Sequence, residues 1–189
     1  MNFLLFFTGG LFGVVLTVFG LGRRISALRW WLGDDGEHET AQQLAQLGAH
    51  WYCEHDLVHA RGNWDHILVG PSGVYLIESK YLHHTAAVRD DTLLSGGLSF
   101  SGSTFRVEAW RIKSELEGRL GFSPRWVQPV VVIWGSFPQK RIKEGRVVYL
   151  AADELVPWLE SRPAQLASPQ QLAAISGIRE LRAVLGAAA

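Results

Sequence analysis

The sequence has a single cysteine, Cys53, among 189 residues. One cysteine excludes an internal disulfide framework and fits a reducing compartment. Because Cys53 is not part of a CxxC pair, we interpret it as a small apolar core residue rather than a reactive thiol. The formal net charge is zero, because 18 Lys and Arg balance 18 Asp and Glu. The chain is therefore no polycation, and contact with nucleic acid would need a local basic patch.

Charged residues are absent from the first part of the chain, between Met1 and Gly22. The apolar run Phe3–Leu21 would be about 28 Å long as a helix, close to the roughly 30 Å hydrocarbon core of a bilayer. We therefore predict a transmembrane anchor over residues 1–22 and a juxtamembrane linker over residues 23–35.

The basic residues near this run decide between two interpretations. A cleaved signal peptide carries its positive charges before the apolar stretch. Here Arg23, Arg24 and Arg29 follow it. This arrangement favours an uncleaved single span, and the excess of positive charge after the span places the C-terminal domain in the cytoplasm.

The rest of the chain alternates between strand and helix patterns. Strands are predicted over 50–58, 64–69, 74–80, 87–94, 98–101, 130–134 and 146–150, and helices over 36–47, 105–120, 153–159 and 168–185. This order predicts a mixed α/β fold with a central mixed β-sheet flanked by helices. We place the core of the domain at 36–135, completed by a C-terminal strand and helices over 136–189.

The tetrad Gly70-Pro71-Ser72-Gly73 is a strong hairpin signal between two of these strands. A four-residue loop would make Val69 face Val74, and the same register sets Asp65 opposite Glu78. A type I turn followed by a glycine bulge would shift the register by one and set Asp65 beside Ser79. In either register Lys80 shares a face with Glu78, because side chains on a strand alternate.

Two facing carboxylates repel each other unless a cation lies between them. Oxygen ligands of this kind suit Mg²⁺ or Mn²⁺, which bind through one or two carboxylates together with substrate phosphate. Lys80 beside the acids can orient a water and stabilise the charge that develops on a phosphate. Glu37 projects from the inward stripe of the predicted helix 36–47 and could add a further contact. These are the parts of a metal-dependent phosphodiester hydrolase.

Two stretches, Gly36-Glu37 and residues 63–80 (NWDHILVGPSGVYLIESK), resemble the nuclease-related domain (NERD) family. That family is grouped with the PD-(D/E)xK nucleases, which hydrolyse DNA with a divalent metal. The resemblance implies a restriction-endonuclease-like fold, Asp65 and Glu78 as metal ligands, and Lys80 and Glu37 as catalytic residues. Nucleic acid, with DNA favoured over RNA, is the partner that it implies.

The chain departs from the family pattern at two places. The usual glycine after the catalytic lysine is missing from Tyr81–Thr85, and the usual Asn-Pro-x-x-Gln stretch is missing from Ser103–Val107. Two alternatives therefore stay open. The first is a catalytically inactive nucleic-acid-binding or scaffolding module at the membrane, and the second is a structural membrane protein in which Asp65 and Lys80 form only an ion pair.

The basic and histidine residues suggest further sites. Lys140, Arg141 and Lys143 form the densest basic cluster and could bind nucleic acid or anionic lipid, although a solvated loop is the interpretation that we favour. Among the histidines, His50 and His55 point to opposite faces of one strand, which argues against a shared zinc ion. His66 points away from Asp65, so we interpret it as packed or solvated.

Overall fold

The computed structural model describes residues 35–120 and 124–188. The predicted membrane span over 1–22 lies outside these residues, as does nearly all of the predicted linker. Within the described ranges, no helix is long and apolar enough to cross a membrane. Residues Gly36–Ala189 form one compact unit, and the fold below is the fold of this unit.

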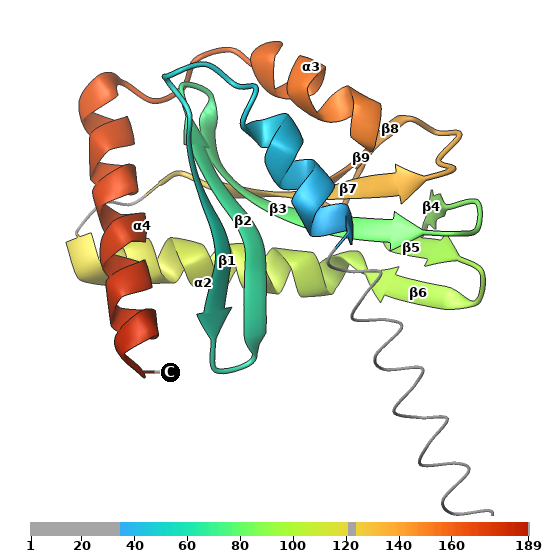
Figure 1. Ribbon diagram of the computed structural model, residues 1–189, viewed down its shortest axis with the longest axis horizontal. Coiled ribbons are helices and arrows are strands. Elements are labelled where there is room, and N and C mark those ends of the chain that lie inside the picture. The colour runs from blue at the N-terminus through green and yellow to red at the C-terminus, as the bar shows by residue number, and fades with distance from the viewer. Residues whose placement is uncertain (1–34, 121–123, 189) are drawn as a thin grey trace, which may run out of the picture. The chain divides into compact units, whose positions relative to one another are not determined.

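A helix over residues 35–44 opens the described part (blue in Figure 1). The main sheet contains β1 (Tyr52–His59), β2 (Gly62–Gly70), β3 (Gly73–Leu82), β7 (Val127–Gly135), β8 (Arg141–Glu144) and β9 (Val147–Ala151). A smaller sheet contains β4 (Ala87–Arg89), β5 (Thr92–Ser95) and β6 (Leu98–Ser101). The other helical elements are α2 (Gly102–Leu120), the short 3-10 helix η1 (Ala152–Glu154), α3 (Leu155–Glu160) and α4 (Ser168–Ala188).

The main sheet has the strand order β1-β2-β3-β7-β9-β8. The pairs β3–β7 and β7–β9 are parallel and the other neighbours are antiparallel. The sheet is therefore mixed, as predicted. The central strand β7 is a nearly continuous apolar run, which is typical of a strand with both faces covered.

Helices cover the sheet on both faces (Figure 1). On one face, α2 and α4 enclose a buried core that includes Ile67, Val69, Ile112, Ala174 and Ile178. On the other face, helix 35–44 and α3 enclose a second core that includes Leu44, Leu68, Val130, Leu155 and Trp158. The predicted central sheet flanked by helices is therefore confirmed.

The β2–β3 hairpin has the register expected for a four-residue loop. Val69 is the partner of Val74, and the ladder runs from Gly70–Gly73 to His66–Ile77. The alternative shifted by one residue is therefore wrong. Gly73 has φ +144°, a conformation that L side chains rarely adopt, so the turn requires a glycine there. The turn chemistry thus sets which side chains of the two strands share a face.

Three local predictions need correction. The predicted strand 87–94 is interrupted by a tight turn at Asp90 and Asp91, whose φ values are +49° and +58°, and therefore forms two strands. The basic cluster interpreted as a loop lies mostly in the edge strand β8. In β1 the regular alternation of side chains between the two sheet faces ends at Asp56, whose φ is +49°. Leu57 was predicted on the same face as Cys53, but it packs in the core under α2 and α4.

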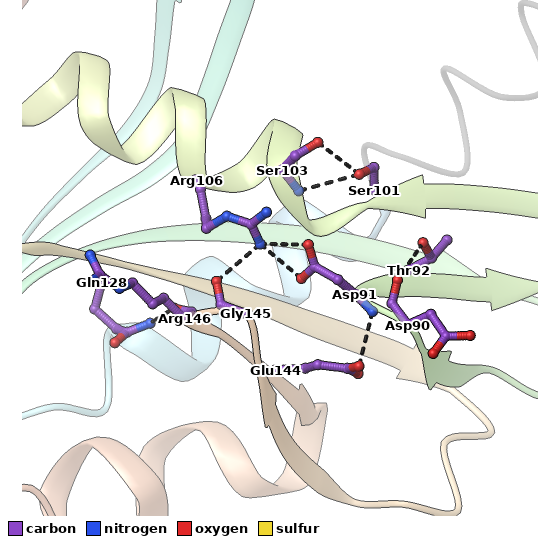
Figure 2. Close-up of polar contacts among 10 residues, drawn as sticks. All are labelled: Asp90, Asp91, Thr92, Ser101, Ser103, Arg106, Gln128, Glu144, Gly145 and Arg146. Carbon is purple, nitrogen blue, oxygen red and sulfur yellow. Dashed lines mark hydrogen bonds and ion pairs between the residues drawn. The ribbon is translucent and has the colours of Figure 1, made fainter.

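An ion pair joins the small sheet to α2 (Figure 2). Nη1 of Arg106 donates to both carboxylate oxygens of Asp91, at 2.8 and 2.6 Å, and to the carbonyl of Gly145 at 3.0 Å. The backbone N–H of Asp91 donates to Oε1 of Glu144 at 3.0 Å. These contacts fix the β4–β5 turn against α2 and the β8–β9 turn. They hold the small sheet, which borders the site described next, in a defined position.

Candidate active site

Strand β3 brings Glu78 and Lys80 to one face of the sheet. Nζ of Lys80 donates to Oε1 of Glu78 at 2.6 Å, and both side chains are about three-quarters buried. The ammonium group also lies 5.7 Å from the ring centroid of Phe100, on β6 of the small sheet. The lysine is therefore held between a carboxylate and an aromatic face, where its long side chain has little freedom.

Asp65 reaches the same place from β2. It is 5 % exposed, and its Oδ2 accepts a hydrogen bond from the backbone N–H of Ser79 at 2.8 Å. The paired ladder between the strands runs as far as His66–Ile77. One position beyond this ladder, the Asp65 side chain accepts the hydrogen bond from the N–H of Ser79. The strands thus hold the carboxylate by a backbone donor that lies between Glu78 and Lys80.

The charges of this cluster act strongly on one another. Burial raises the pKa of Asp65 well above its ordinary value, and the neighbouring charges of Glu78 and Glu37 raise it further against the opposing effect of Lys80. For Lys80, burial lowers the pKa, but Glu78, Asp65 and Glu37 outweigh it and the pKa is raised. Among the described residues, three carboxyl groups therefore surround one largely buried ammonium group.

Helix 35–44 places Glu37 in this cluster through two contacts beside it. Gly36 packs so closely on β3 that an added Cβ would be 3.4 Å from the backbone nitrogen of Tyr81. One turn along, the buried Thr40 hydroxyl donates to the carbonyl of Gly36 at 2.8 Å. It also accepts from Ser79 Oγ at 2.9 Å and from Trp134 Nε1 at 2.8 Å. The start of the helix is therefore tied to both β3 and β7.

The profile of the nuclease-related domain (NERD) matches residues 32–134. This match covers more than half of the chain. The chain belongs to the NERD family. No curated protein and no solved structure matches it. The matched region contains Glu37, Asp65, Glu78 and Lys80, which we call the acid cluster. Strands β8 and β9 and helices α3 and α4 lie beyond it.

The residues of this NERD site fit a divalent cation. Carboxylate oxygens are the ligands that Mg²⁺ and Mn²⁺ prefer. Burial and the neighbouring carboxylates raise the pKa of Asp65, which disfavours its ionised form in the protein alone. A bound cation would favour that ionised form. Asp65 and Glu78 are the acids best placed for this role, because Glu78 and the N–H donor to Asp65 lie on adjacent positions of β3.

The predicted nucleic-acid-binding residues do not join this cluster. Lys140 pairs with Asp153 at 2.6 Å, and both side chains are more than half exposed. Arg141 and Lys143 lie on β8, which β7 and β9 separate from β3. Their side chains line a hollow of about 400 Å³ together with Arg162 and Trp158. Trp158 belongs to the core under α3, so this basic hollow opens on the sheet face opposite the α2 side.

Two polar residues of the site carry no signal in the sequence. Thr40 and Ser79 are both buried and hydrogen-bonded to each other. Ser79 lies between the two charged residues that attract attention, and Thr40 resembles any polar residue of an amphipathic helix. A threonine one turn after an acidic residue, at a position that faces the sheet, is the only pattern that could have pointed to Thr40.

Proposed function

We propose that this NERD protein is a nuclease that hydrolyses phosphodiester bonds of nucleic acid, DNA in preference to RNA, with Mg²⁺ or Mn²⁺. The observation that supports it most is the crowding of Asp65, Glu78 and Glu37 around Lys80. Burying like charges together is costly, and such arrangements cluster at functional sites. A nuclease-related function itself follows from the family.

Each residue of the cluster has a proposed role. Asp65 and Glu78 would hold the metal ion, and the N–H of Ser79 would keep the Asp65 carboxylate in place. When bound, such an ion polarises a phosphoryl oxygen and lowers the pKa of a coordinated water. Lys80 would position the attacking water and stabilise the negative charge that develops on the phosphate. Glu37 would accept a hydrogen bond from that water and help to orient it.

A cleavage assay tests these roles. The full chain, purified in detergent, is incubated with plasmid and single-stranded DNA in the presence of Mn²⁺. Glu78→Ala and Lys80→Ala should each lower the cleavage rate by about 100-fold or more. Glu39→Gln, an exposed carboxylate on the same helix as Glu37, should cleave like the wild type. Cleavage that survives both alanine substitutions would refute the assignment.

A second candidate is a NERD module that binds nucleic acid without cleaving it. The absence of the Asn-Pro-x-x-Gln stretch from Ser103–Val107 favours it. The same assay distinguishes the two candidates, because this module would retain DNA on a filter or gel without metal-dependent cleavage.

We also propose that residues 3–21 anchor the protein in a membrane, with the C-terminal domain in the cytoplasm. The support is the charge-free run from Met1 to Gly22 and the three arginines that follow it. An anchored chain should stay in the membrane fraction after washing with high salt. A C-terminal tag that external protease removes from intact cells would contradict the orientation.

A further inference from the structure

A second group of potential metal ligands lies on the strands β1 and β2. Cys53, His55 and His66 each offer one ligand atom, and these three atoms lie within 4.8 Å of one another. His55 and His66 are direct cross-strand partners, and Cys53 is two residues from His55 on the same strand face. Nδ1 of His55 is 2.8 Å from Nδ1 of His66 and 3.8 Å from Sγ of Cys53.

These distances are close to those that one small ion requires. Zinc binds imidazole nitrogen at about 2.0–2.1 Å and thiolate sulfur at about 2.3 Å. Ligand atoms at tetrahedral angles are then roughly 3.3–3.6 Å apart. The observed distances of 2.8 and 3.8 Å lie on either side of this range. His55 is exposed and Cys53 is half-buried. Rotation of these two side chains can therefore bring the ligand atoms to tetrahedral distances without movement of the strands.

The surroundings of His66 support such a role. With Nδ1 directed at the cluster, its Nε2 lies 3.4 Å from Oγ of Ser79. That hydroxyl donates its own hydrogen to Thr40 at 2.9 Å, so it keeps a lone pair for an N–H of His66. Histidines that bind metals almost always donate their other ring N–H to an oxygen in this way. The buried histidine is thus oriented before any ion arrives.

We propose that Cys53, His55 and His66 form a second metal site, selective for Zn²⁺-like transition ions and separate from the Asp65–Glu78 site. One thiolate and two imidazoles suit zinc or cobalt, whereas Mg²⁺ and Mn²⁺ prefer oxygen. Three protein ligands leave one coordination position open, and the exposed His55 gives it access to solvent. Binding would displace the thiol proton of Cys53, because the thiolate is the form that binds a metal ion.

An ion in this cluster would also act on the candidate active site. Ser79 contacts His66 through its hydroxyl and Asp65 through its backbone N–H. The ion would join β1 to β2 next to this residue and restrain its position. The cluster is therefore a means by which a transition ion could stabilise the strands that carry the acids.

Cobalt spectroscopy tests the site without any readout of cleavage. Co²⁺ is titrated into the reduced full-length chain, and a thiolate-to-cobalt charge-transfer band is recorded with the visible bands of the ion. Since Cys53 is the chain's single cysteine, any such band reports on Cys53. The wild type should show the band at one equivalent, Cys53→Ser should lose it, and Zn²⁺ should displace the cobalt.

Substitutions at the histidines and at Asp65 distinguish this site from cobalt bound elsewhere on the chain. His55→Gln changes an exposed side chain and should fold normally while the Co²⁺ affinity falls at least tenfold. His50→Gln, an exposed histidine outside the cluster, and Asp65→Asn should both keep the band. The absence of the band from the wild type, or wild-type Co²⁺ affinity in His55→Gln, would overturn the proposal. Loss of the band in Asp65→Asn would show that the two sites are not separate and would overturn it as well.

Discussion

At the scale of single residues, Asp65 carries the clearest physical signature in the protein. Its pKa is raised by burial and then by the charges of Glu78 and Glu37. The folded protein therefore binds the Asp65 proton more tightly than the unfolded chain does. The stability that this provides is fully present below the ordinary pKa of 3.8 and is lost as the pH rises through the raised folded-state pKa.

Asp65→Asn should remove this pH dependence. Asn keeps an acceptor for the N–H of Ser79 but carries no charge. At neutral pH in a metal-free buffer, the variant should be more stable than the wild type by roughly 1–3 kcal/mol. Urea unfolding at several pH values measures the difference, which should shrink toward acid pH. Asp153→Asn, at an exposed position, should show no such trend, and an Asp65→Asn variant less stable at every pH would contradict the account.

The residues of the acid cluster could be found from the sequence because a single turn sets their register. The loop Gly70–Gly73 determines which side chains of β2 and β3 share a face, so its register predicts Asp65 close to Glu78. In the structure the ladder ends at His66–Ile77, and Asp65 accepts a hydrogen bond from Ser79, the residue after Glu78. The polar network of Thr40, Ser79 and His66 could not be found in this way. It depends on how a helix docks on the sheet, and the spacing within one strand or helix does not contain that information.

The cysteine and histidine cluster was missed for a related reason. Comparing histidines along one predicted strand overlooks neighbours on the next strand, and His50 lies in a turn before β1. His55 and His66 are eleven positions apart in sequence and are direct partners in the sheet. The β1–β2 register that pairs them depends on the turn near Gly62, whose sequence signal is weaker than that of the β2–β3 turn.

At the scale of elements, one buried hydroxyl links helix 35–44 by hydrogen bonds to two strands of the sheet. The Thr40 side chain satisfies donors from both Ser79 and Trp134, and it is fully buried. Since the same helix carries Glu37, the position of this acid depends on Thr40. A threonine in a helix is an ordinary residue by propensity, and its importance here comes entirely from the strands on which it packs.

Thr40→Val should therefore weaken the protein although it preserves the shape of the side chain. The hydroxyl and ring N–H that point at Thr40 would lose their acceptor, and each unsatisfied buried donor costs about 1–3 kcal/mol. Chemical denaturation should show a loss of stability of roughly 2–6 kcal/mol for the two donors together. Thr85→Val, at an exposed threonine, should stay within about 0.5 kcal/mol of the wild type. Equal stability of the two variants would show that the Thr40 network is not important.

Element boundaries were predicted less well where aspartates adopt left-handed backbone conformations. Asp90 and Asp91 end β4 and begin a new strand, and Asp56 changes the face to which β1 directs its side chains. Only a few per cent of residues other than glycine have positive φ, although aspartate is enriched among them. The long apolar strand β3 leaves no such ambiguity, and its extent was close to the prediction, whereas β7 begins at Val127, before the predicted run 130–134.

At the scale of the whole molecule, the acid cluster and the basic hollow lie apart. Asp65, Glu78 and Glu37 surround Lys80 beside the central strand β3, whereas Arg141, Lys143 and Arg162 line the hollow of about 400 Å³ at the edge strand β8. The formal net charge of zero therefore does not describe the local charge at either place. A long polyanion could contact the basic hollow, whereas the small cluster of acids would repel it in the absence of metal.

Replacing the basic hollow should change how DNA binding responds to salt. Each phosphate contact contributes about 0.9 to the slope of log affinity against log salt concentration for duplex DNA. The double variant Arg141→Gln, Lys143→Gln should therefore bind DNA more weakly, and its affinity should depend less steeply on salt, with a slope smaller in magnitude by up to about 2. Fluorescence anisotropy at several salt concentrations measures it. Arg61→Gln, an exposed arginine at the β1–β2 turn, is the matched control, and identical slopes in all three proteins would exclude the hollow from DNA binding.

The most direct test of the central claim is Mn²⁺ binding to the full-length chain, measured by isothermal titration calorimetry. The account predicts saturable Mn²⁺ binding in the wild type, lost in Asp65→Asn and Glu78→Gln and retained in Glu39→Gln and Cys53→Ser. Unchanged Mn²⁺ binding in the first two variants would show that these acids do not hold the ion. A wild type that binds no Mn²⁺ would contradict the proposed site altogether.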